Sequence, residues 1–562
     1  MSKNMKAIEF PTPSYTDWVE AATKALKGKP LESLFTKTIE NITLDPLYTE
    51  QQLIEKYGEQ LEKQVATIRQ ATNDDRFVTA QQVLGDTEEA FIANLEESLA
   101  RGNEVITIDS RVSFDWNERI LETVADYITR YPFKLIVQSN EDSLLNVFNY
   151  IAKEELNTIE GYVISLQGTV ELSYPSVRTS CANTVNIHND GANAVQELAY
   201  ALAAASELAG KAESFEQFVN KFFVNFAIDT QFFMEIAKVR AFKVLWKAFT
   251  SAYGVEHVNV PVVAETSVRS FSKFDVYVNL LRAGNETLSA AIGGVDVFTI
   301  HPHDVLTSTT EQSVRIARNI SLVTKEESHV LNVLDPAGGS YFVESLTADL
   351  VKEAWALFLR IEEAGGINAY ASTLAEEVAA VYAERLAQVG TRKHSLIGTN
   401  IYANPTDELP TAENPIYANV KRLAKPFETL RAQFNNKAVN VEILTFGELK
   451  NYKPRADFVA GFLAVAGIEA NITQGFKTVE EASNYLQQTK ASYVVIAATD
   501  EDTKNIVPAL LEEKPTNIVL DAAGRYKEEA QAWQAAGLNG FIYAGQNIVD
   551  KLQQVAATLG EA

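Results

Sequence analysis

The sequence predicts an α/β protein with two parallel α/β domains of unequal size, preceded by an N-terminal arm. Two observations predict this organisation. Between residues 61 and 400, strand-like segments alternate with helical ones, and from residue 438 the same alternation restarts on a smaller scale. At 562 residues, the chain is also long enough to bury more than one hydrophobic core.

Residues 1–60 form the arm, because they hold too few apolar side chains for a core of their own. Ser14 and Asp17 have the spacing of a capping box, so we expect a helix to begin at this point. An apolar stripe at helical spacing follows, made of Trp18, Val19, Ala22 and Leu26. We expect the arm to serve subunit association, although packing on the larger domain is an equal alternative.

The larger domain, residues 61–400, contains clear strand-like segments with helical runs between them. These segments are Glu104–Asp109, Phe133–Gln138, Gly161–Leu166, Val258–Ala264 and Val295–Ile300. Their alternation with helices predicts a parallel sheet, and the length of the domain suits a (β/α)8 TIM barrel. Periodicity alone also allows a doubly wound sheet.

Residues 401–437 are expected to be a linker over the surface. They carry four prolines among polar residues, at Pro405, Pro410, Pro415 and Pro426. Residues 438–562 then predict a flavodoxin-like, Rossmann-type domain with a parallel sheet. Its expected strands are Val439–Thr445, Ala470–Thr473, Tyr493–Ala498, Asn517–Leu520 and Gly540–Ala544.

Composition limits the possible partners. The chain carries 49 Lys and Arg against 74 Asp and Glu, a net charge of −25, which argues against nucleic acids and anionic membranes. Its single cysteine excludes an intrachain disulfide and suits a reducing compartment. The N-terminus lacks the apolar core of a signal peptide, so we expect a cytoplasmic protein without a membrane span.

The stretch from Tyr174 to Gly210 brings Cys181 and His188 together in sequence. We expect a strand over Thr184–Ile187 and a helix from Ala192 to Leu208. Asp190 or Asn193 is the expected N-cap of that helix. Polar residues between a strand and the following helix are typical of the functional end of α/β folds. His188 is nevertheless interpreted as a hydrogen-bonded structural residue.

Several segments, taken in order, resemble the methylmalonyl-CoA mutases over nearly the whole chain. They are Thr67-Ile-Arg-Gln70, Asp190–Leu202, Phe232–Arg240, Asp275–Tyr277, Gly293-Gly294, Val314–Asn319 and Asp335–Tyr341. This resemblance favours the TIM barrel for the larger domain and a cobalamin-binding-like fold for the smaller one. It also implies methylmalonyl-CoA and succinyl-CoA as the substrates of the assembled enzyme.

The resemblance also implies that catalytic residues have been lost. The family's barrel tyrosine falls on Ala71, and its two histidines fall on Asn186 and Thr299. The catalytic histidine therefore does not fall on His188. No catalytic residue is expected in this chain.

The cobalamin motif of the family, Asp-x-His-x-x-Gly, falls on Lys450, Tyr452 and Arg455. Tyrosine does not replace a neutral imidazole on cobalt, and we expect the bulk of Tyr452 and Arg455 to fill the cleft. The family's Gly-Gly after the fourth strand falls on Asp521-Ala522. No cofactor-binding residue is expected here. Adenosylcobalamin is expected on a large catalytic subunit, with this chain as the small structural subunit of a heterodimer.

Other interpretations stay open. The chain could be an active acyl-CoA mutase with unusual cofactor binding, or a chaperone or sensor that binds cobalamin or a mutase without turnover. His301 and His303 have the spacing of metal ligands on one strand face, but partly exposed loop histidines after a strand are the favoured interpretation. Four cationic side chains suit either CoA phosphates or ordinary structural pairing: Arg178, Arg269, Lys273 and Arg282.

Overall fold

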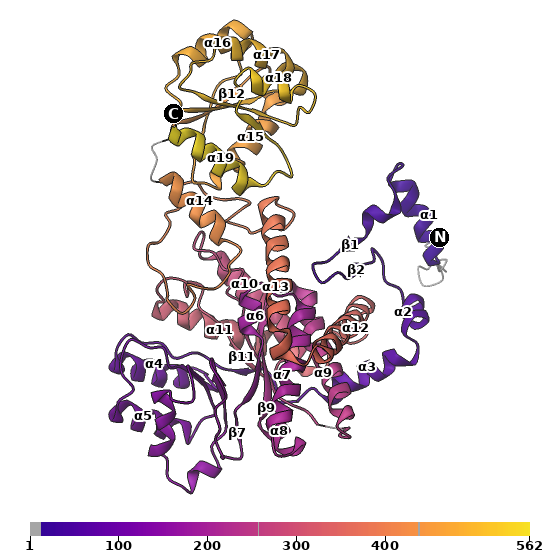
Figure 1. Ribbon diagram of the computed structural model, residues 1–562, viewed down its shortest axis with the longest axis vertical. Coiled ribbons are helices and arrows are strands. Elements are labelled where there is room, and N and C mark those ends of the chain that lie inside the picture. The colour runs from indigo at the N-terminus through magenta and orange to yellow at the C-terminus, as the bar shows by residue number, and fades with distance from the viewer. Residues whose placement is uncertain (1–12, 257, 436–438, 562) are drawn as a thin grey trace, which may run out of the picture.

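In the computed structural model, which describes residues 13–256, 258–435 and 439–561, the chain forms three parts (Figure 1). An arm at the N-terminus extends from one side of a body built around parallel strands. The C-terminal domain lies at the far end of the long helix α13 (Ile367–Gly390). Among the described residues, no helix has both the length and the apolar character needed to cross a membrane.

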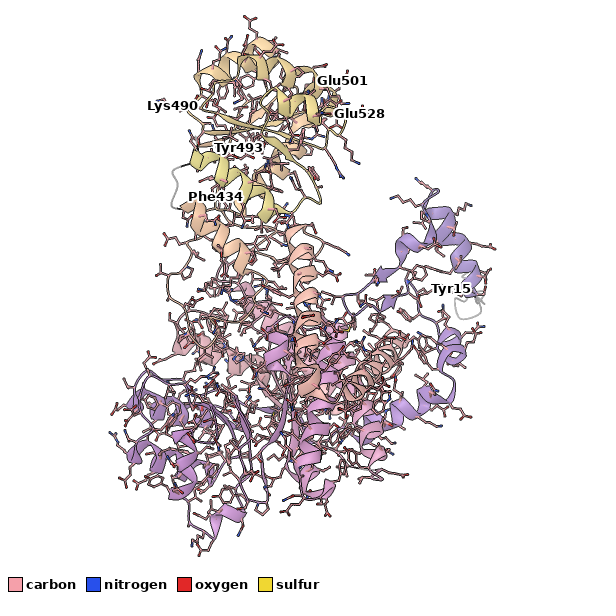
Figure 2. The ribbon with its side chains drawn as sticks, in the orientation of Figure 1. Tyr15, Phe434, Lys490, Tyr493, Glu501 and Glu528 are labelled. Carbon is pink, nitrogen blue, oxygen red and sulfur yellow. The ribbon has the colours of Figure 1, made fainter. Side chains whose placement is uncertain are left out.

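The arm begins with the predicted capping box. The Ser14 hydroxyl accepts a hydrogen bond from the Asp17 backbone N–H, and the Asp17 carboxylate accepts one from the Ser14 N–H, which starts α1 (Tyr15–Ala25). No residue between 13 and 35 is buried, and α1 stands apart from the body, as Tyr15 does in Figure 2. A 3₁₀-helix (Leu31–Leu34) and the antiparallel pair β1 (Thr36–Lys37) and β2 (Thr43–Leu44) follow.

The base of the arm packs on the body through two helices, α2 (Glu50–Tyr57) and α3 (Glu59–Gln70). Lys56 and Tyr57 at the end of α2 both bond to the Asp349 carboxylate, at 3.0 and 3.1 Å. Asp349 belongs to α12 (Tyr341–Glu363), so these bonds anchor the end of α2 to the body.

The strands of the body form two parallel sheets, ordered β8-β9-β10-β11-β3 and β4-β5-β6-β7. Their bounds are β3 Val78–Thr79, β4 Ile106–Asp109, β5 Phe133–Val137, β6 Gly161–Ser165, β7 Val177–Arg178, β8 Ser180–Asn183, β9 Phe222–Ile228, β10 Val262–Thr266 and β11 Val297–Thr299. Parallel strands need crossover segments, and helices supply most of them. The predicted mixed α/β class with parallel sheets is confirmed.

Two features connect the two sheets of the body. Next to β3 and β4, the Val105 N–H donates to the Thr79 carbonyl and the Val83 N–H to the Thr107 carbonyl. On the other side, β7 and β8 follow each other with one residue between them, while β7 pairs with β6 and β8 pairs with β9. One buried apolar cluster draws on both sheets: Ala80, Val105, Ile164, Phe223, Val263 and Val297.

Helices flank these strands. The α-helices of the body are α4 Glu88–Ala100, α5 Glu118–Ile128, α6 Val185–Asn189, α7 Ala194–Lys211, α8 Phe215–Lys221, α9 Phe232–Ala252, α10 Val278–Gly293 and α11 Glu311–Glu327, followed by α12 and α13. Shorter 3₁₀-helices span Ser143–Tyr150, Glu155–Asn157 and Val330–Asn332. Apolar faces of α7, α9 and α12 share the largest buried cluster with the outer side chains of β9 and β10.

The expected strand over Thr184–Ile187 is wrong. Strand β8 ends at Asn183, and the backbone N–H and hydroxyl of Thr184 make its last bonds to β9, at the Asn225 carbonyl. The His188 N–H then bonds to the Thr184 carbonyl and α6 begins. Of the two expected N-caps for the next helix, Asn193 caps α7, with Gln196 completing a capping box.

The C-terminal domain has one parallel sheet ordered β13-β12-β14-β15-β16, with buried apolar clusters on its two faces. Its elements are β12 Val441–Thr445, α15 Leu449–Ala464, β13 Asn471–Ile472, α16 Val479–Gln488, β14 Tyr493–Ala497, α17 Asp500–Glu513, β15 Val519–Ala523, α18 Ala530–Ala535, β16 Gly540–Ile542 and α19 Ile548–Glu561. The chain order reverses between β12 and β14, and such switch points create a crevice at the carboxyl edge of a sheet.

The segment expected as a surface linker contains a helix, α14 (Lys425–Asn435), beside the C-terminal domain (Figure 2). Phe427, Leu430 and Phe434 are buried in the same cluster as Val441 and Val555 of that domain. Proline in the first turn of a helix, here Pro426, does not disrupt it. Residues 436–438 lie outside the described residues.

Candidate functional site

The three positions where the resemblance places catalytic residues lie on different elements. Ala71 follows the last residue of α3, Asn186 lies exposed on α6, and Thr299 ends β11 and is buried. Within the described ranges, no hydrogen bond joins any two of their side chains. Alanine, asparagine and threonine carry no group that exchanges a proton near neutral pH, so these positions offer no general acid or base.

A charged side chain crosses the space between the two sheets of the body. Lys134 on β5 is fully buried, and its Nζ donates to the Thr299 hydroxyl at 2.6 Å. Its Nζ also lies 4.0 Å from Glu265 on β10. Burial lowers the pKa of Lys134, which the Glu265 charge counteracts only in part. The interior next to Thr299 is therefore occupied by this lysine.

Above this pair, a tyrosine from the 401–437 segment covers the carboxyl end of the strands. The Tyr417 hydroxyl lies 3.3 Å from His301 Nδ1, and His301 Nε2 lies 3.3 Å from the Glu265 carboxylate. Burial would raise the pKa of Glu265, but the His301 hydrogen bond and the charges nearby lower it. Lys134, Glu265 and Tyr417 are not predicted from sequence, because nothing local in the chain links them.

The two histidines considered as metal ligands are both buried, so the expectation that they are partly exposed is wrong, and they contact different partners. His301 contacts Glu265 and Tyr417, whereas His303 stacks on the Tyr277 ring with centroids 5.4 Å apart. Among the described residues, no cluster of three or more His, Cys, Asp or Glu side chains could hold a metal ion. A pair of imidazoles with different partners is not a ligand set for zinc.

His188 is fully buried and hydrogen-bonded at both ring nitrogens. Nδ1 is 2.8 Å from Glu197, and Nε2 is 2.7 Å from the Ser267 hydroxyl. Burial, together with the charge of Arg269, lowers the pKa of His188 to about 4 despite Glu197. Lys238 pairs with the other Glu197 oxygen at 2.9 Å. Hydrolases also join an acid, a histidine and a serine in this way, but here all three side chains are enclosed in the core.

We expect stability to fall between about pH 6.5 and 4 because of His188. Above pH 6.5 the ring is neutral in both states; below it, the unfolded chain binds a proton that the folded chain refuses until about pH 4. The loss should reach about 3 kcal/mol at pH 4. Urea unfolding at several pH values gives the free energy of unfolding of the wild type and of His188→Gln. This free energy should fall less steeply with decreasing pH in His188→Gln than in the wild type. The exposed His329→Gln is the control and should keep the wild-type slope; an unchanged slope in His188→Gln would contradict the expectation.

The four cationic side chains considered for CoA all bond within the protein. Arg178 donates to the Val219 and Phe222 carbonyls, Arg269 pairs with Asp229 at 2.6 Å, Lys273 lies 3.4 Å from Glu413, and Arg282 donates to Asn279 and the Ile397 carbonyl. Each of the four therefore already has a partner within the chain. This pairing favours the structural interpretation.

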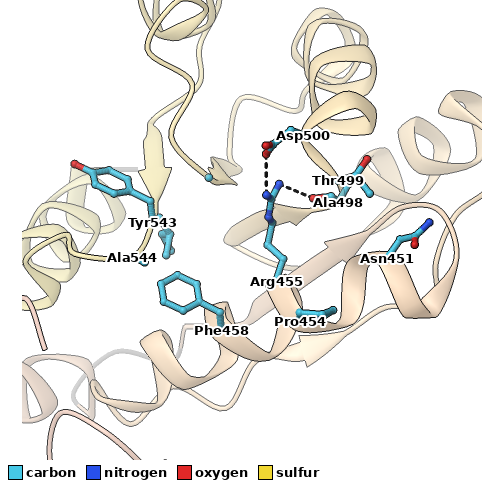
Figure 3. Close-up of a pocket in the computed structure, with 11 residues that line it drawn as sticks. Asn451, Pro454, Arg455, Phe458, Ala498, Thr499, Asp500, Tyr543 and Ala544 are labelled. Atoms are coloured by element: carbon cyan, nitrogen blue, oxygen red, sulfur yellow. Dashed lines mark hydrogen bonds and ion pairs between the residues drawn. The ribbon is translucent and has the colours of Figure 1, made fainter. Parts of the chain in front are cut away.

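The carboxyl edge of the C-terminal sheet has a cleft of about 520 Å³ (Figure 3). Arg455 from α15 extends across it and donates to the Ala498 carbonyl at 2.6 Å, the Tyr526 hydroxyl at 2.9 Å and Asp500 at 2.7 Å. The hydrogen bond from Arg455 lowers the pKa of Asp500 below its ordinary value. Phe458 and Tyr543 line the other side. The cleft thus contains an ion pair at the position where the motif of the resembling family has glycine.

The other two positions of the degenerate motif lie outside this cleft. Lys450 is exposed and pairs with Glu448 at 2.8 Å. Tyr452 is buried and its ring lies so close to Gly475 that a Cβ there would be 2.5 Å from it. All three motif positions lie on α15 rather than in a loop. Of the two side chains expected to fill the cleft, Arg455 lines it and leaves about 520 Å³ open, and Tyr452 packs elsewhere.

Asp521 and Ala522 do not follow the strand, as the resemblance suggested, but lie within β15. Asp521 is buried and pairs with Lys551 at 2.6 Å while Tyr493 donates to it at 2.5 Å. The strand ends at Ala523, and the next residue, Gly524, lines the cleft with φ +126. A glycine with positive φ therefore lies at this edge two residues after Ala522.

Comparison with known proteins gives a consistent result. A sequence profile of the family described as methylmalonyl-CoA mutase matches residues 156–486. The chain is 30% identical over 601 residues to the methylmalonyl-CoA mutase small subunit of Porphyromonas gingivalis, covering 97% of each. It is 28% identical to the methylmalonyl-CoA mutase small subunit of Streptomyces virginiae, covering 69% of this chain and 65% of the relative.

Among solved structures, 7,8-dihydropteroate synthase from Vibrio fischeri ES114 aligns with 45% of this chain and 95% of its own, at 12% identity. The TM-score is 0.24, which supports no argument about the fold. The sequence matches are decisive because the profile covers more than half of the chain and the first relative spans nearly all of it. The chain belongs to the methylmalonyl-CoA mutase family.

Proposed function

We propose that this chain is the small, non-catalytic subunit of a heterodimeric methylmalonyl-CoA mutase, which interconverts methylmalonyl-CoA and succinyl-CoA. The observation that carries the proposal is the interior next to Thr299, where the family has a histidine. Lys134 occupies that interior, and Tyr417 covers it. Relatives named small subunits imply a large partner subunit. We infer a cytoplasmic location from the single cysteine.

We further propose that the body, residues 61–400, is a closed (β/α)8 barrel with an arm at residues 1–60. The hydrogen bonds between the residues around β3 and β4 support closure on one side, and the shared run of β7 and β8 supports it on the other. Side chains of both sheets also meet in one apolar cluster. Layers of inward side chains of this kind fill TIM barrels.

We infer that the partner subunit, not this chain, binds adenosylcobalamin, the cofactor that supplies the radical for this class of rearrangement. The residues present do not fit it. The C-terminal domain, residues 438–562 after the 401–437 linker, has no histidine at all, since His394 is the last in the sequence. Arg455 and its ion pair with Asp500 also cross the cleft that the cofactor tail would need.

Activity with and without the partner tests the proposed role. The purified chain alone should show no isomerisation of methylmalonyl-CoA with adenosylcobalamin present. With the large subunit, one-to-one heterodimers should be active, and Thr299→Ser or Asn186→Ala in this chain should leave their rate unchanged. Turnover by the isolated chain would support the active-mutase alternative. A complex that forms and then dissociates, so that the large subunit turns over alone, would support the chaperone alternative.

We propose that the arm binds the partner subunit. Residues 13–35 bury no side chain in this chain, and contact with the body begins near Ile39, whose carbonyl accepts a hydrogen bond from Asn193. Truncation of residues 1–35 should leave the melting temperature of the isolated chain unchanged. It should weaken heterodimer affinity at least tenfold, measured by surface plasmon resonance. Equal affinity of the truncated and full chains would show that the arm does not serve association.

A further inference from the structure

Helix α10 carries a buried carboxyl group that none of the interactions described above involves. Glu286 is 0% exposed, and neither of its carboxylate oxygens has a hydrogen-bond partner among the described residues. Within those residues, it is the one carboxylate with both oxygens buried and unpaired. An ionised carboxylate in such a position is costly, because burial removes its hydration and nothing replaces it.

Two donors that act on Glu286 make their hydrogen bonds to other acceptors. Arg282 lies one turn earlier on α10, but its guanidinium donates to the Asn279 side chain at 2.6 Å and to a backbone carbonyl at 2.9 Å. The Ser267 backbone N–H donates to the Ile228 carbonyl at 2.9 Å. Neither donor therefore replaces the water that an ionised carboxylate would lose.

The other buried cations of the elements around α10 also have partners of their own. These pairs are Lys238 with Glu197 and Glu235, Lys243 with Thr72, Arg240 with Asp335 and Glu344, Arg269 with Asp229, and Arg318 with Glu97. Among the described residues of α9, α11 and the loop after β10, each buried cation is therefore bound to a group other than Glu286.

Carboxylates, in contrast, lie around Glu286. Its neighbour Asn285 donates to the Thr230 carbonyl at 2.9 Å, which places this turn of α10 beside the end of β9. Asp229 directly follows β9, and Glu235 lies in the first turn of α9. Ionisation of Glu286 would thus place a further negative charge in the core beside other carboxylates.

We propose that Glu286 is a neutral carboxylic acid in the folded chain at neutral pH, and that its ionisation at higher pH weakens the packing of α10 on α9. Folding of the body then takes up one proton from the solvent, and the Glu286 carboxylate binds it. Helix α10 thus makes the stability of the body sensitive to rising pH. This property does not depend on the subunit role.

The pH dependence has a defined sign. Burial raises the pKa of Glu286 well above its ordinary value, and the charges of Asp229 and Glu235 raise it further, whereas Arg282 and the Ser267 N–H lower it. In the unfolded chain the carboxyl loses its proton near pH 4.5, while the folded chain keeps it. From pH 4.5 up to the folded pKa, unfolding releases this proton, so the equilibrium constant for unfolding rises about tenfold per pH unit.

Urea unfolding between about pH 5 and 8 compares the full-length wild type with Glu286→Gln, which has the same shape but cannot ionise. The ratio of their unfolding constants, wild type over variant, should rise about tenfold per pH unit until Glu286 ionises in the folded chain. Other titrating groups cancel in this ratio. The infrared spectrum at neutral pH should show the carbonyl stretch of a protonated carboxyl, and this band should lose intensity in Glu286→Gln. If the glutamine variant does not fold, the apolar Glu286→Met, of similar length, gives the same two comparisons.

The matched control is Glu501→Gln, a change at an exposed glutamate of α17 (Figure 2). It should keep the pH dependence and the infrared band of the wild type. A ratio that stays constant with pH for Glu286→Gln would overturn the proposal, and so would a band of unchanged intensity. Equal effects of both variants would mean that only the net charge of −25 matters, which would overturn it too. Absence of the band from the wild type at neutral pH would overturn it without any variant.

Discussion

Replacement of Arg240 by methionine should destabilise the body by about 3–5 kcal/mol. Arg240 on α9 is fully buried, and its guanidinium bonds to both Asp335 and Glu344. Those two carboxylates join the loop before α12 to its first turn, and Gln64 of the arm base also donates to Glu344 at 2.7 Å. Methionine has a comparable length but leaves two buried charges without their cation. Urea unfolding monitored by circular dichroism measures the loss.

A surface ion pair is the control for Arg240. Arg119 lies 3.4 Å from Glu89 and both side chains are largely exposed, so Arg119→Met should change stability by less than about 0.5 kcal/mol. If Arg240→Met also lost less than about 1 kcal/mol, the buried ion pairs would not hold α9 and α12 together.

Replacement of Phe427 by alanine should show that α14 belongs to the C-terminal domain. Its ring is fully buried among the side chains of that domain, so Phe427→Ala should cost about 3–5 kcal/mol. Hydrogen exchange followed by mass spectrometry should show faster exchange in β12 and α19, because the cavity loosens the cluster they share with α14.

Phe233→Ala is the matched control, because this phenylalanine is half exposed at the start of α9. It should leave exchange in β12 and α19 unchanged. If Phe427→Ala accelerated exchange only within α14, that helix would be a surface element as the proline pattern suggested, and the cluster would not depend on it.

The strands predicted from sequence are those with turn residues on both sides. β4, β5, β6, β10 and β11, and all the strands of the C-terminal sheet, fall on predicted segments. Strand β9, Phe222–Ile228, is not predicted although every residue in it is buried. It follows α8 directly at Lys221, so no glycine, proline or polar turn separates helix from strand, and an apolar run alone does not distinguish them.

The sequence predicts those features of the candidate site that depend on the identity of a single residue. The replacements Ala71, Asn186 and Thr299 can be read from the sequence, and so can the long side chain of Arg455 in place of glycine. The contacts of Lys134 with Thr299, and of Tyr417 with His301, join residues more than a hundred positions apart. Only the folded chain brings these residues together. The Tyr452 ring likewise packs on Gly475, a neighbour that the sequence pattern does not reveal.

Adenosylcobalamin should bind to the partner subunit and not to this chain. Equilibrium binding of adenosylcobalamin, followed by its visible spectrum, tests this directly on the isolated chain and on the reconstituted heterodimer. The isolated chain should leave the spectrum of the free cofactor unchanged, and the heterodimer should bind one equivalent. Saturable binding to the isolated chain, or two equivalents per heterodimer, would contradict the proposed division of roles.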